Sequence, residues 1–523
     1  MSTYFTEEHE LFRQSLRAFL KKEAIPHIDQ WEEDRKTPRE IWKKMGDMGF
    51  LGLSYPEEYG GLGLDFFYDV VFNEEMGRTN SGGFAITQQV TQYMSCPNIL
   101  KYGSAELKQK YLPGIISGDL ISSIGITEPG AGSDAQNIKT TAIKDGDHYI
   151  VNGAKTFITN GIYGDFIVTV VKTDPEAGAA GVSLLILEQK MEGVTSRKLK
   201  KLGWHSSDTA ELNFDNVRVP VSNLIGEEGR GFYYLMNGLQ LERLCAVPAA
   251  VTACENAIEM SLQYMSEREA FGKKINRFQV LRHRIAQLAS EVEALKAFTY
   301  HCCEMYANNI YDVKLCSMAK LLGTELAEKV ATECLQFFGG YGFMEEYPMA
   351  RMYRDVRVGT IGGGSSEIMR EIIAKIVIDG QGYVNPKSSG NGIVERKSNT
   401  PGGSGKSDSG NGSAATAIET TTAPEATIED IVKGIQSKAS AVDALGKTLK
   451  FDFGGEQVTI DGTGADNQVS ASNTDADCTI KISKSDFHKL VSGDLNPMTA
   501  VMSGQVKIDG DMGLAMKLQS LFS

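Results

Sequence analysis

The sequence of 523 residues lacks long hydrophobic runs, and none approaches the ~18 apolar residues that a membrane-spanning helix needs. It also lacks an excess of positive charge, because 67 Asp and Glu outnumber 53 Lys and Arg and the formal net charge is −14. Proteins that bind nucleic-acid phosphates usually carry Lys and Arg in excess. The composition therefore argues against an integral membrane protein and against a nucleic-acid partner.

Cysteine is scarce, and its arrangement excludes further classes of site. The eight cysteines form no C-x-x-C pair and have no His at ligand spacing, so we expect free buried thiols and no metal site. The first twenty residues, MSTYFTEEHELFRQSLRAFL, show neither the apolar core of a secretory signal nor an Arg-rich, acid-poor leader. This predicts a cytoplasmic protein, although a processed protein of the mitochondrial matrix or the peroxisome would present the same sequence.

The length exceeds the ~250–300 residues at which a single hydrophobic core stops growing, so several domains are expected. Changes in the sequence pattern along the chain predict a multidomain α+β protein. Its predicted parts are an N-terminal α-helical domain (1–118), a middle β domain (119–228), a C-terminal four-helix bundle (229–382), a disordered linker (383–426) and a small α/β domain (427–523).

Hydrophobic periodicity supports the first three parts. Phe12, Leu16, Phe19 and Leu20 recur on one helix face, with polar residues opposite. The middle part consists of short β-branched runs such as FIVTVV and VSLLIL between Gly, Asp and Asn, a pattern typical of an antiparallel barrel or sandwich. The long helical run that begins EREAFGKKINRFQ favours a bundle, and such bundles commonly pack across subunits.

The end of the chain reads as a tethered module. Gly, Ser, Thr and Asn dominate the predicted linker, which has almost nothing apolar to bury. The strands KTLKFDFGG, EQVTIDGT and CTIKISK that follow, with helices on one side, predict a small domain able to enclose an apolar tunnel. This module resembles the sterol-carrier lipid-transfer family, which implies a lipid or acyl ligand. Four methionines form either an adaptable lipid-facing wall or ordinary core packing: Met498, Met502, Met512 and Met516.

The segment ITEPGAGSD, residues 126–134, is followed by VNGAKTFITNG, residues 151–161. Its Pro and Gly turns and small side chains leave backbone amides uncovered, so that an anion or a flat polar ring can lie against them. A lone Gly-rich loop is also an ordinary tight turn between strands. The two segments together resemble the flavin-binding part of the acyl-CoA dehydrogenase family, and this resemblance covers roughly the first three quarters of the chain.

The resemblance implies an FAD site shared between the subunits of a homotetramer. Phe157 stands where the family often has Trp, and it would pack against the isoalloxazine face, with Thr159 near the flavin N5. The other residues implied to contact FAD in the same subunit are Ile126, Thr127, Gly132, Ser133, Ser365 and Glu367. Those implied to reach a neighbouring subunit's FAD are Arg268, Phe271, Gln279, Gln336 and Gly340. Ser133, Leu241, Arg243 and Gly363 are implied to contact acyl-CoA.

The catalytic base does not stand in its usual place. Removing two hydrogens from an acyl thioester requires a base for the α-proton and a hydride acceptor at the β-carbon. Many family members have a Glu in the turn that here reads TIGGGSSEI, at the position of Gly363. In the isovaleryl-type and long-chain-type branches the base resembles Glu242 in GLQLERLCAV. Two carboxylates at one α-carbon would repel each other, so a Gly in the turn is expected where the helix carries the acid. A solvated helix acid paired with Arg243 is the alternative.

The sequence thus favours FAD-dependent α,β-dehydrogenation of long-chain or branched acyl-CoA to trans-2-enoyl-CoA. The resemblance implies an electron-transfer flavoprotein as the electron acceptor. An acyl-CoA oxidase is a mechanistic neighbour that passes electrons to oxygen. An alternative of another class is a lipid carrier whose dehydrogenase part is only a scaffold.

Overall fold

The computed structural model describes residues 4–310 and 312–380, and of the C-terminal part residues 432, 435–436, 446–464, 466–472, 474, 476–484, 486–487 and 507–510. The chain divides into two compact units, and the first contains the described residues up to 380 while the second contains those from 432 onward. The predicted linker and the four C-terminal methionines lie outside the described residues.

The chain begins with helices, as predicted. The amphipathic stripe of the first helix buries Leu16 and Leu20, and the side chains of Thr6, Asp65 and Ser81 cap three helix N-termini by accepting backbone N–H groups. The helices are α1 (Glu7–Glu23), α2 (Ile28–Asp34), α3 (Arg39–Asp47), α4 (Phe66–Gly77), α5 (Gly82–Gln89), α6 (Cys96–Tyr102) and α7 (Ala105–Ile116), with a π-helical turn at Val90–Ser95 between α5 and α6.

The middle part is one curled seven-stranded sheet. Its strands are β1 (Ser122–Gly125), β2 (Thr141–Asp145), β3 (His148–Thr159), β4 (Phe166–Lys172), β5 (Val182–Glu188), β6 (Val194–Lys198) and β7 (Thr209–Pro220), in the order β1-β4-β2-β3-β7-β6 with β5 on β4. β1 pairs with β4 in parallel, which the expectation of an antiparallel sheet did not include. Val168 and Leu184 pack against α7, whereas Val171 and Leu185 pack in a second cluster with β3 and β7. The sheet is thus buried on both faces at β4 and β5.

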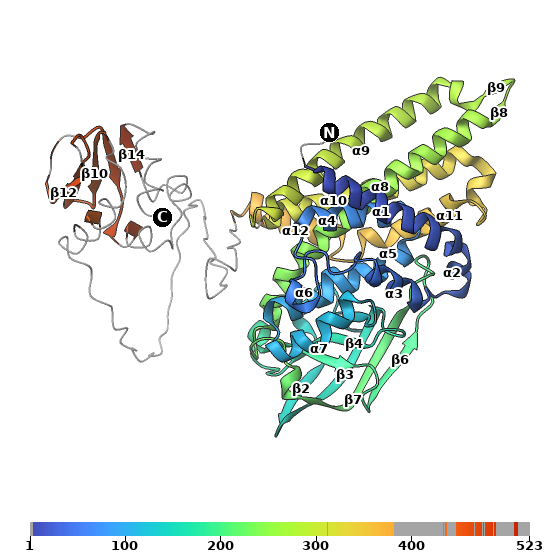
Figure 1. Cartoon of the computed structure of the whole chain (residues 1–523), viewed down its shortest axis with the longest axis horizontal. Helices are drawn as coiled ribbons and strands as arrows, with labels where there is room; N and C mark the ends of the chain where they lie inside the picture. The colour runs from blue at the N-terminus through green and yellow to red at the C-terminus, as the bar shows by residue number, and fades with distance from the viewer. Residues whose placement is uncertain are drawn as a thin grey trace, which may run out of the picture. The chain divides into compact units, whose positions relative to one another are not determined.

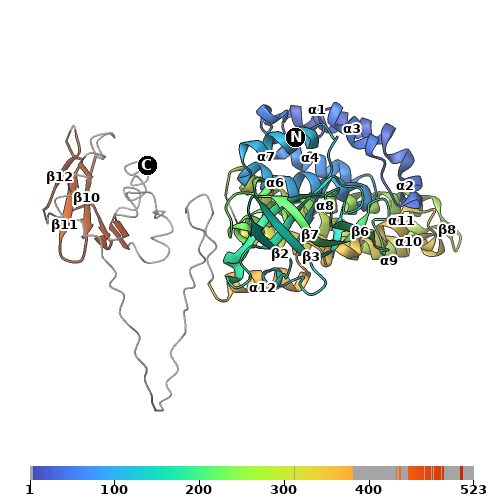
Figure 2. The same ribbon diagram turned by 90° about the horizontal axis from the view of Figure 1, so that it is seen from below.

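Long helices return after the sheet. They are α8 (Gly231–Glu267), α9 (Gln279–Ala307), α10 (Val313–Phe338), α11 (Pro348–Val356) and α12 (Ser366–Val377), and a short hairpin of β8 (Glu269–Ala270) and β9 (Lys273–Lys274) joins α8 to α9. Figure 1 shows α8, α9 and α10 running alongside one another. In Figure 2 the helices α1, α3 and α7 lie on one side of this unit and α9 and α12 on the other. Helices are thus followed by a sheet and then by helices again, which confirms the predicted fold class of an α-helical, a β and a second α-helical part.

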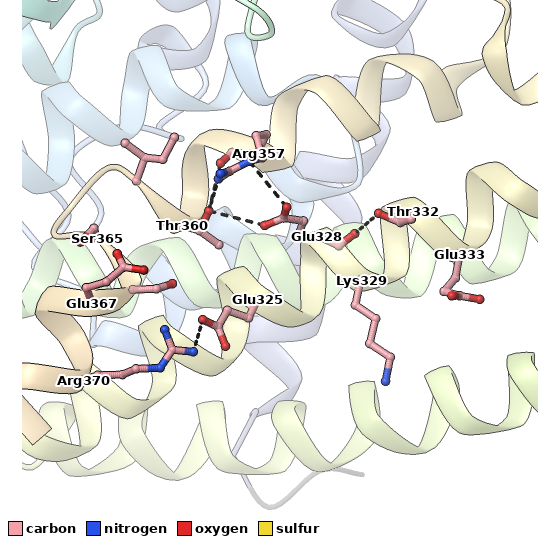
Figure 3. Close-up of a pocket in the computed structure, with 12 residues that line it drawn as sticks. Glu325, Glu328, Lys329, Thr332, Glu333, Arg357, Thr360, Ser365, Glu367 and Arg370 are labelled. Atoms are coloured by element: carbon pink, nitrogen blue, oxygen red, sulfur yellow. Dashed lines mark hydrogen bonds and ion pairs between the residues drawn. The ribbon is translucent and has the colours of Figure 1, made fainter. Parts of the chain in front are cut away.

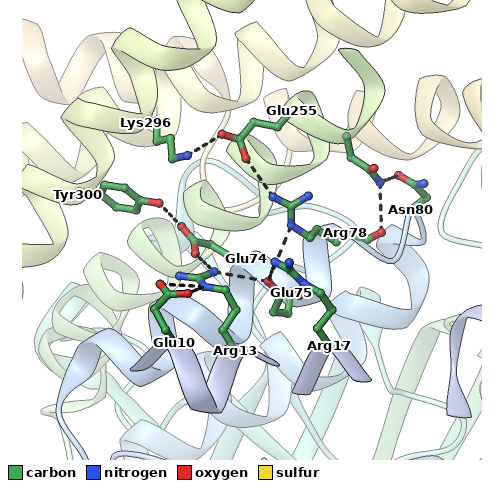
Figure 4. Close-up of polar contacts among 11 residues, drawn as sticks. Glu10, Arg13, Arg17, Glu74, Glu75, Arg78, Asn80, Glu255, Lys296 and Tyr300 are labelled. Carbon is green, nitrogen blue, oxygen red and sulfur yellow. Dashed lines mark hydrogen bonds and ion pairs between the residues drawn. The ribbon is translucent and has the colours of Figure 1, made fainter. Parts of the chain in front are cut away.

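A buried network of charges ties the N-terminal helices to the bundle (Figure 4). Glu74 and Glu75 of α4 are almost fully buried, and they accept hydrogen bonds from Arg13 at 2.5 Å and Arg17 at 2.6 Å on α1. The hydroxyl of Tyr300 on α9 donates to Glu74 at 2.5 Å. Because each buried carboxylate has a cationic partner, the network fixes α1 and α9 against α4, the helix that packs on α8.

All eight cysteines are free and buried, as predicted. Among the described residues, no helix combines the length and the apolar character needed to cross a bilayer. No group of three or more His, Cys, Asp and Glu side chains in the described part of the chain could hold a metal ion.

The second unit contains a five-stranded sheet. Its strands are β10 (Thr448–Asp452), β11 (Gln457–Asp461), β12 (Gln468–Ser470), β13 (Cys478–Lys481) and β14 (Lys507–Gly510), in the order β12-β11-β10-β13-β14. Leu449, Val458 and Ile480 are buried, and the rings of Phe451 and Phe487 meet edge to face at 5.1 Å. A small sheet with an apolar, aromatic face agrees with the predicted α/β domain.

Candidate active site

The carboxylate of Glu242 lies beside the glycine turn that precedes α12. Glu242 is half-buried on α8, about three turns from the start of that helix. A Cβ atom added to Gly363 would lie 3.5 Å from Oε1 of Glu242. The helix acid therefore occupies the space that a side chain on the turn would enter. The two positions considered for the base, Glu242 on the helix and the position of Gly363 in the turn, thus direct a side chain to the same point in this fold.

The surroundings of Glu242 suit a proton acceptor at neutral pH. Burial raises the pKa of Glu242 to about 7, and the charges of Arg243 and Lys320 oppose that rise. A general base works best when its pKa lies near the operating pH. A half-buried carboxyl with a raised pKa does not behave as the solvated helix acid of the alternative interpretation.

Two cations hold the carbonyl groups of the glycine turn. Gly363 and Gly364 have φ values of +63° and +93°, a conformation that favours glycine. Arg243 donates from Nε to the carbonyl of Gly363 at 3.3 Å, and Lys320 donates from Nζ to the carbonyl of Gly364 at 2.6 Å. The predicted substrate residue Arg243 thus braces the turn, while Leu241 is half-buried and packs against the core of the N-terminal helices.

The segment 126–134 is anchored to β3 by a buried ion pair. Lys155 of β3 is fully buried and donates to Glu128 at 2.7 Å and to the carbonyl of Ile126 at 3.1 Å. Burial lowers the pKa of Lys155 to about 8, and Glu128 opposes the shift. Burial would raise the pKa of Glu128, but the Lys155 charge and hydrogen bonds from Lys155, Thr140 and the Lys139 amide hold it below its usual range, so the pair is ionised at neutral pH.

This anchoring leaves the Gly-rich part of the segment open. Gly130, Gly132 and Ser133 are exposed, and a Cβ on either glycine would meet no atom within 4 Å. The buried pair therefore fixes the two ends of a loop whose backbone amides remain available to an acceptor.

The end of β3 presents an aromatic side chain and a hydroxyl group. Phe157 is 70% exposed and has a φ of +62°, at an irregularity in the pairing of β3 with β7. Thr159 is half-buried and pairs with Thr209 across the two strands. A large aromatic side chain held outward in a costly backbone conformation is uncommon in a strand interior. An exposed aromatic face, a hydroxyl and an open amide-bearing loop form a donor set that fits the flat, polar ring of a flavin.

The turn continues into a pocket of about 530 Å³ along α10, where Ser365 and Glu367 lie. Ser365 caps α12 by accepting the N–H of Ile368, and Glu367 is an exposed acid in the first turn of that helix. Arg370 pairs with Glu325 on the facing side of the pocket (Figure 3). The pocket is lined by charged and polar residues of α10, of α12 and of the turn Arg357–Thr360, and Glu242 is not among them.

The five residues implied to serve a neighbouring subunit lie around the far ends of α8 and α10. Arg268 caps the end of α8, the 94% exposed Phe271 lies in the turn of the β8–β9 hairpin, and Gln279 begins α9. Gln336 and Gly340 are exposed at the end of α10 and in the turn after it. The hydroxyl of Tyr264 on α8 donates to the carbonyl of Phe338 at 3.2 Å, which joins the two helix ends. These five residues thus lie on or next to the ends of α8, α9 and α10 that meet at the β8–β9 hairpin, and Figure 1 shows this hairpin away from α12, the helix that follows the glycine turn.

Three side chains of the site were not among the predicted contacts. Glu128 and Lys155 stand inside the motif, and an acid and a lysine within an otherwise buried pattern are a signal that they pair. Lys320 lies 78 residues after Glu242 on another helix, and the sequence does not distinguish it from the other polar residues of α10. No spacing rule connects a lysine on one helix to a glycine turn 44 residues further along the chain.

Comparisons with known proteins agree with this geometry. Models of the acyl-CoA dehydrogenase N-terminal, middle and C-terminal domains match residues 6–119, 123–217 and 229–378, and the model of the SCP-2 sterol transfer family matches residues 428–523. The long-chain specific acyl-CoA dehydrogenase of Mus musculus mitochondria is 41% identical over 379 residues, which cover 72% of this chain and 87% of that protein.

Solved structures show the same similarity. An acyl-CoA dehydrogenase from Geobacillus kaustophilus is 48% identical with a TM-score of 0.70, and the match covers 72% of this chain and all of that one. An acyl-CoA dehydrogenase complexed with FAD from Bacillus anthracis is 32% identical with a TM-score of 0.66, covering 71% and 68%. A chain from a structure entitled as the electron transferring flavoprotein of Acidaminococcus fermentans is 35% identical with a TM-score of 0.70, covering 72% and 100%. The chain belongs to the acyl-CoA dehydrogenase family of flavin-dependent enzymes, and it carries a C-terminal SCP-2 sterol-transfer domain.

Proposed function

We propose that this enzyme oxidises acyl-CoA thioesters at the Cα–Cβ bond to trans-2-enoyl-CoA, with Glu242 as the base that takes the α-proton. The observation that carries the proposal is the 3.5 Å separation between Oε1 of Glu242 and the Cβ position of Gly363. The family's alternative base position and the helix acid meet there. A carboxyl with a pKa of about 7 accepts a proton near neutral pH.

FAD would be held by the exposed loop of Gly132 and Ser133, by Ile126 and Thr127, and by Phe157 and Thr159 at the end of β3. When bound, the flavin supplies the acceptor for the hydride that leaves the β-carbon. The chain itself has three tasks. Glu242 accepts the α-proton, the amide of Gly363 donates to the thioester carbonyl and so acidifies the α-carbon, and the surrounding helices exclude water from the reacting atoms.

Long-chain or branched acyl groups are the preferred substrates in this proposal. The mouse relative at 41% identity is named long-chain specific, and its match covers 87% of that protein. An attached domain of the sterol-transfer family suits an acyl chain that is poorly soluble in water. We assign a lipid or acyl ligand to that domain and an electron-transfer flavoprotein as the acceptor of the electrons.

We also propose a homotetramer in which Arg268, Phe271, Gln279, Gln336 and Gly340 reach the FAD of a neighbouring subunit. Their position at the hairpin end of the bundle supports this assignment, because within one chain they lie apart from the loop at Ser133 and from Glu242. The guanidinium of Arg268 is exposed and suited to binding phosphate oxygens.

The test is the bleaching of the flavin by palmitoyl-CoA under anaerobic conditions. Glu242→Gln keeps the size of the side chain but removes the base, so we expect it to bind FAD and to lose flavin reduction by at least ~10³-fold. Glu259→Gln, at an exposed position of the same helix, serves as the matched control and should reduce normally. Bleaching of Glu242→Gln at the wild-type rate would contradict the assignment of the base.

Two further outcomes of the same measurement decide between the alternatives. Rapid reoxidation of the reduced wild-type enzyme by oxygen, faster than by an electron-transfer flavoprotein, would identify an oxidase. If no acyl-CoA of any chain length reduced the flavin of the wild-type protein, the dehydrogenase function would be excluded and the lipid-carrier alternative would be favoured.

A further inference from the structure

The glycine turn before α12 depends on side chains from other helices for its shape. A run of three glycines, Gly362–Gly364, has more backbone freedom than any other tripeptide. Its geometry must therefore be imposed from outside. Gly364 is held closely, because a Cβ there would lie 2.7 Å from Cε of Met369 and 3.6 Å from the guanidinium of Arg243.

Lys320 is the second cation on this turn, and it comes from α10. Its side chain is 3% exposed, and its ammonium donates to the carbonyl of Gly364 at 2.6 Å. Its Cε lies 3.9 Å from the Cβ position of Gly363, the point that Oε1 of Glu242 approaches to 3.5 Å. Burying an ammonium is costly unless it is paired and hydrogen-bonded. The Lys320 ammonium is thus bound to the turn, and its side chain and the Glu242 carboxylate approach the same point at Gly363.

The charges that face Lys320 come from three helices. Arg243 and Glu242 are on α8, Glu325 is on α10 itself, and Glu367 is on α12. Burial lowers the pKa of Lys320 to about 8 and Arg243 acts in the same direction, while the three carboxylates oppose the shift. The ammonium is thus charged at neutral pH, and Glu242 has a cationic neighbour that is not on its own helix.

We propose that Lys320 is a positioning residue of the dehydrogenation: it fixes the glycine turn through the carbonyl of Gly364 and places a positive charge beside the Glu242 carboxylate. This inference rests on the proposed function, in which the amide of Gly363 binds the thioester carbonyl and Glu242 takes the α-proton. Arg243 braces the preceding carbonyl. The two cations together hold the donor and the base in a fixed relation to each other.

The test compares Lys320→Met, which keeps the length of the side chain and removes the charge, with Lys320→Arg, which keeps the charge. Lys314→Met, a half-exposed lysine two turns earlier on α10, is the matched control. Flavin reduction by palmitoyl-CoA is followed by stopped-flow absorbance between about pH 6 and 9, a range that brackets the pKa expected of the base. The loss of a positive charge makes the Glu242 carboxylate less stable, so the acidic limb of the pH profile should move to higher pH in Lys320→Met.

We expect the limiting reduction rate of Lys320→Met to fall at least ~10-fold, with its Kd for palmitoyl-CoA within about threefold of the wild-type value. Lys320→Arg should keep the wild-type acidic limb. A purely structural lysine would alter stability but leave the pH profile in place. A Lys320→Met enzyme with the wild-type limiting rate and the wild-type acidic limb would overturn the proposal.

Amide hydrogen exchange of the segment Thr360–Ser366 in the FAD-loaded protein provides a readout independent of catalysis. Loss of the bond to Gly364 should speed exchange in Lys320→Met but not in Lys314→Met. Unchanged protection in Lys320→Met would contradict the role of Lys320 in holding the turn. If wild-type flavin were reduced by no acyl-CoA, the proposed function would fail, while this comparison would still decide whether Lys320 holds the turn.

Discussion

The carboxyl of Glu242 links the chemistry of the site to the stability of the protein. Its pKa of about 7 in the folded state lies above the ordinary value of 4.5, so the folded protein binds the proton more tightly than the unfolded chain does. Where the folded state binds more protons, the free energy of unfolding falls as the pH rises. The ionisation of this group therefore lowers the free energy of unfolding between about pH 4.5 and pH 7, the same range in which the proposed base becomes able to accept a proton.

We predict that Glu242→Gln removes this pH dependence. The free energy of unfolding of the variant, relative to that of the wild type, should be higher at pH 8 than at pH 5 by on the order of 1–2 kcal/mol. This value is reduced because the group is partly exposed. Urea unfolding of both proteins at the two pH values measures the difference, with FAD loading held equal. A stability difference that is the same at pH 5 and pH 8 would show that the carboxyl has an ordinary pKa.

At the scale of single elements, the loop at Gly132 and Ser133, which we propose to hold the flavin, depends on a buried ion pair for its anchoring. Lys155 is buried on β3 and Glu128 is buried in the segment after β1, and together they hold the carbonyl of Ile126 and the amides of Lys139 and Thr140. Breaking a buried pair by removing one partner leaves the other charge buried without compensation. The loop at Gly132 and Ser133 would then lose its anchor to β3.

We predict that Lys155→Met lowers the free energy of unfolding by about 3 kcal/mol and lowers FAD occupancy by more than about tenfold. The ratio of absorbance at 450 and 280 nm measures occupancy, and thermal unfolding measures stability. Arg197→Met is the control, because Arg197 pairs with Glu211 on the exposed face of β6 and β7 and should change stability by less than about 0.5 kcal/mol. Full FAD occupancy in Lys155→Met would show that the loop does not need this pair.

Elements and contacts differ in how well the sequence predicts them. The helix of Leu16 and Leu20 follows from its apolar periodicity, and the structure has it. The parallel pairing of β1 with β4 cannot be predicted from the composition of the strands, because it depends on a crossover between segments separated by 40 residues. Glu242 was selected as the candidate base by resemblance, whereas the contact of Lys320 with the turn was not predicted, since its partner is a backbone carbonyl that carries no side-chain signal. Contacts to backbone across helices are the part that a single sequence conceals.

At the scale of the whole molecule, the two units are held in one chain by a segment whose residues 383–426 are rich in Gly, Ser and Thr. The sequence predicts a disordered linker here, and a linker of about 40 residues with that composition would have a root-mean-square reach of roughly 35 Å and would give the sterol-transfer domain a high effective concentration at the enzyme. Mass action then predicts which substrates gain from the tether. An acyl-CoA that the domain binds is delivered locally, whereas a short one that stays free in water gains nothing.

We predict that ending the chain after Gly380 leaves the turnover of butyryl-CoA unchanged within about twofold and lowers kcat/KM for palmitoyl-CoA by about 5- to 50-fold at submicromolar substrate. The dehydrogenase unit has its own hydrophobic clusters, which extend from α1 to α11, so the shortened chain should still bind FAD. Adding the sterol-transfer domain as a separate protein should restore activity only when that domain is present at high concentration. Without the covalent linker, it no longer has a high effective concentration at the enzyme. Equal losses for both substrates would mean that the domain supports folding and not delivery. If the shortened chain kept the full-length kcat/KM for both butyryl-CoA and palmitoyl-CoA, the ligand of the domain would not be the substrate of the enzyme.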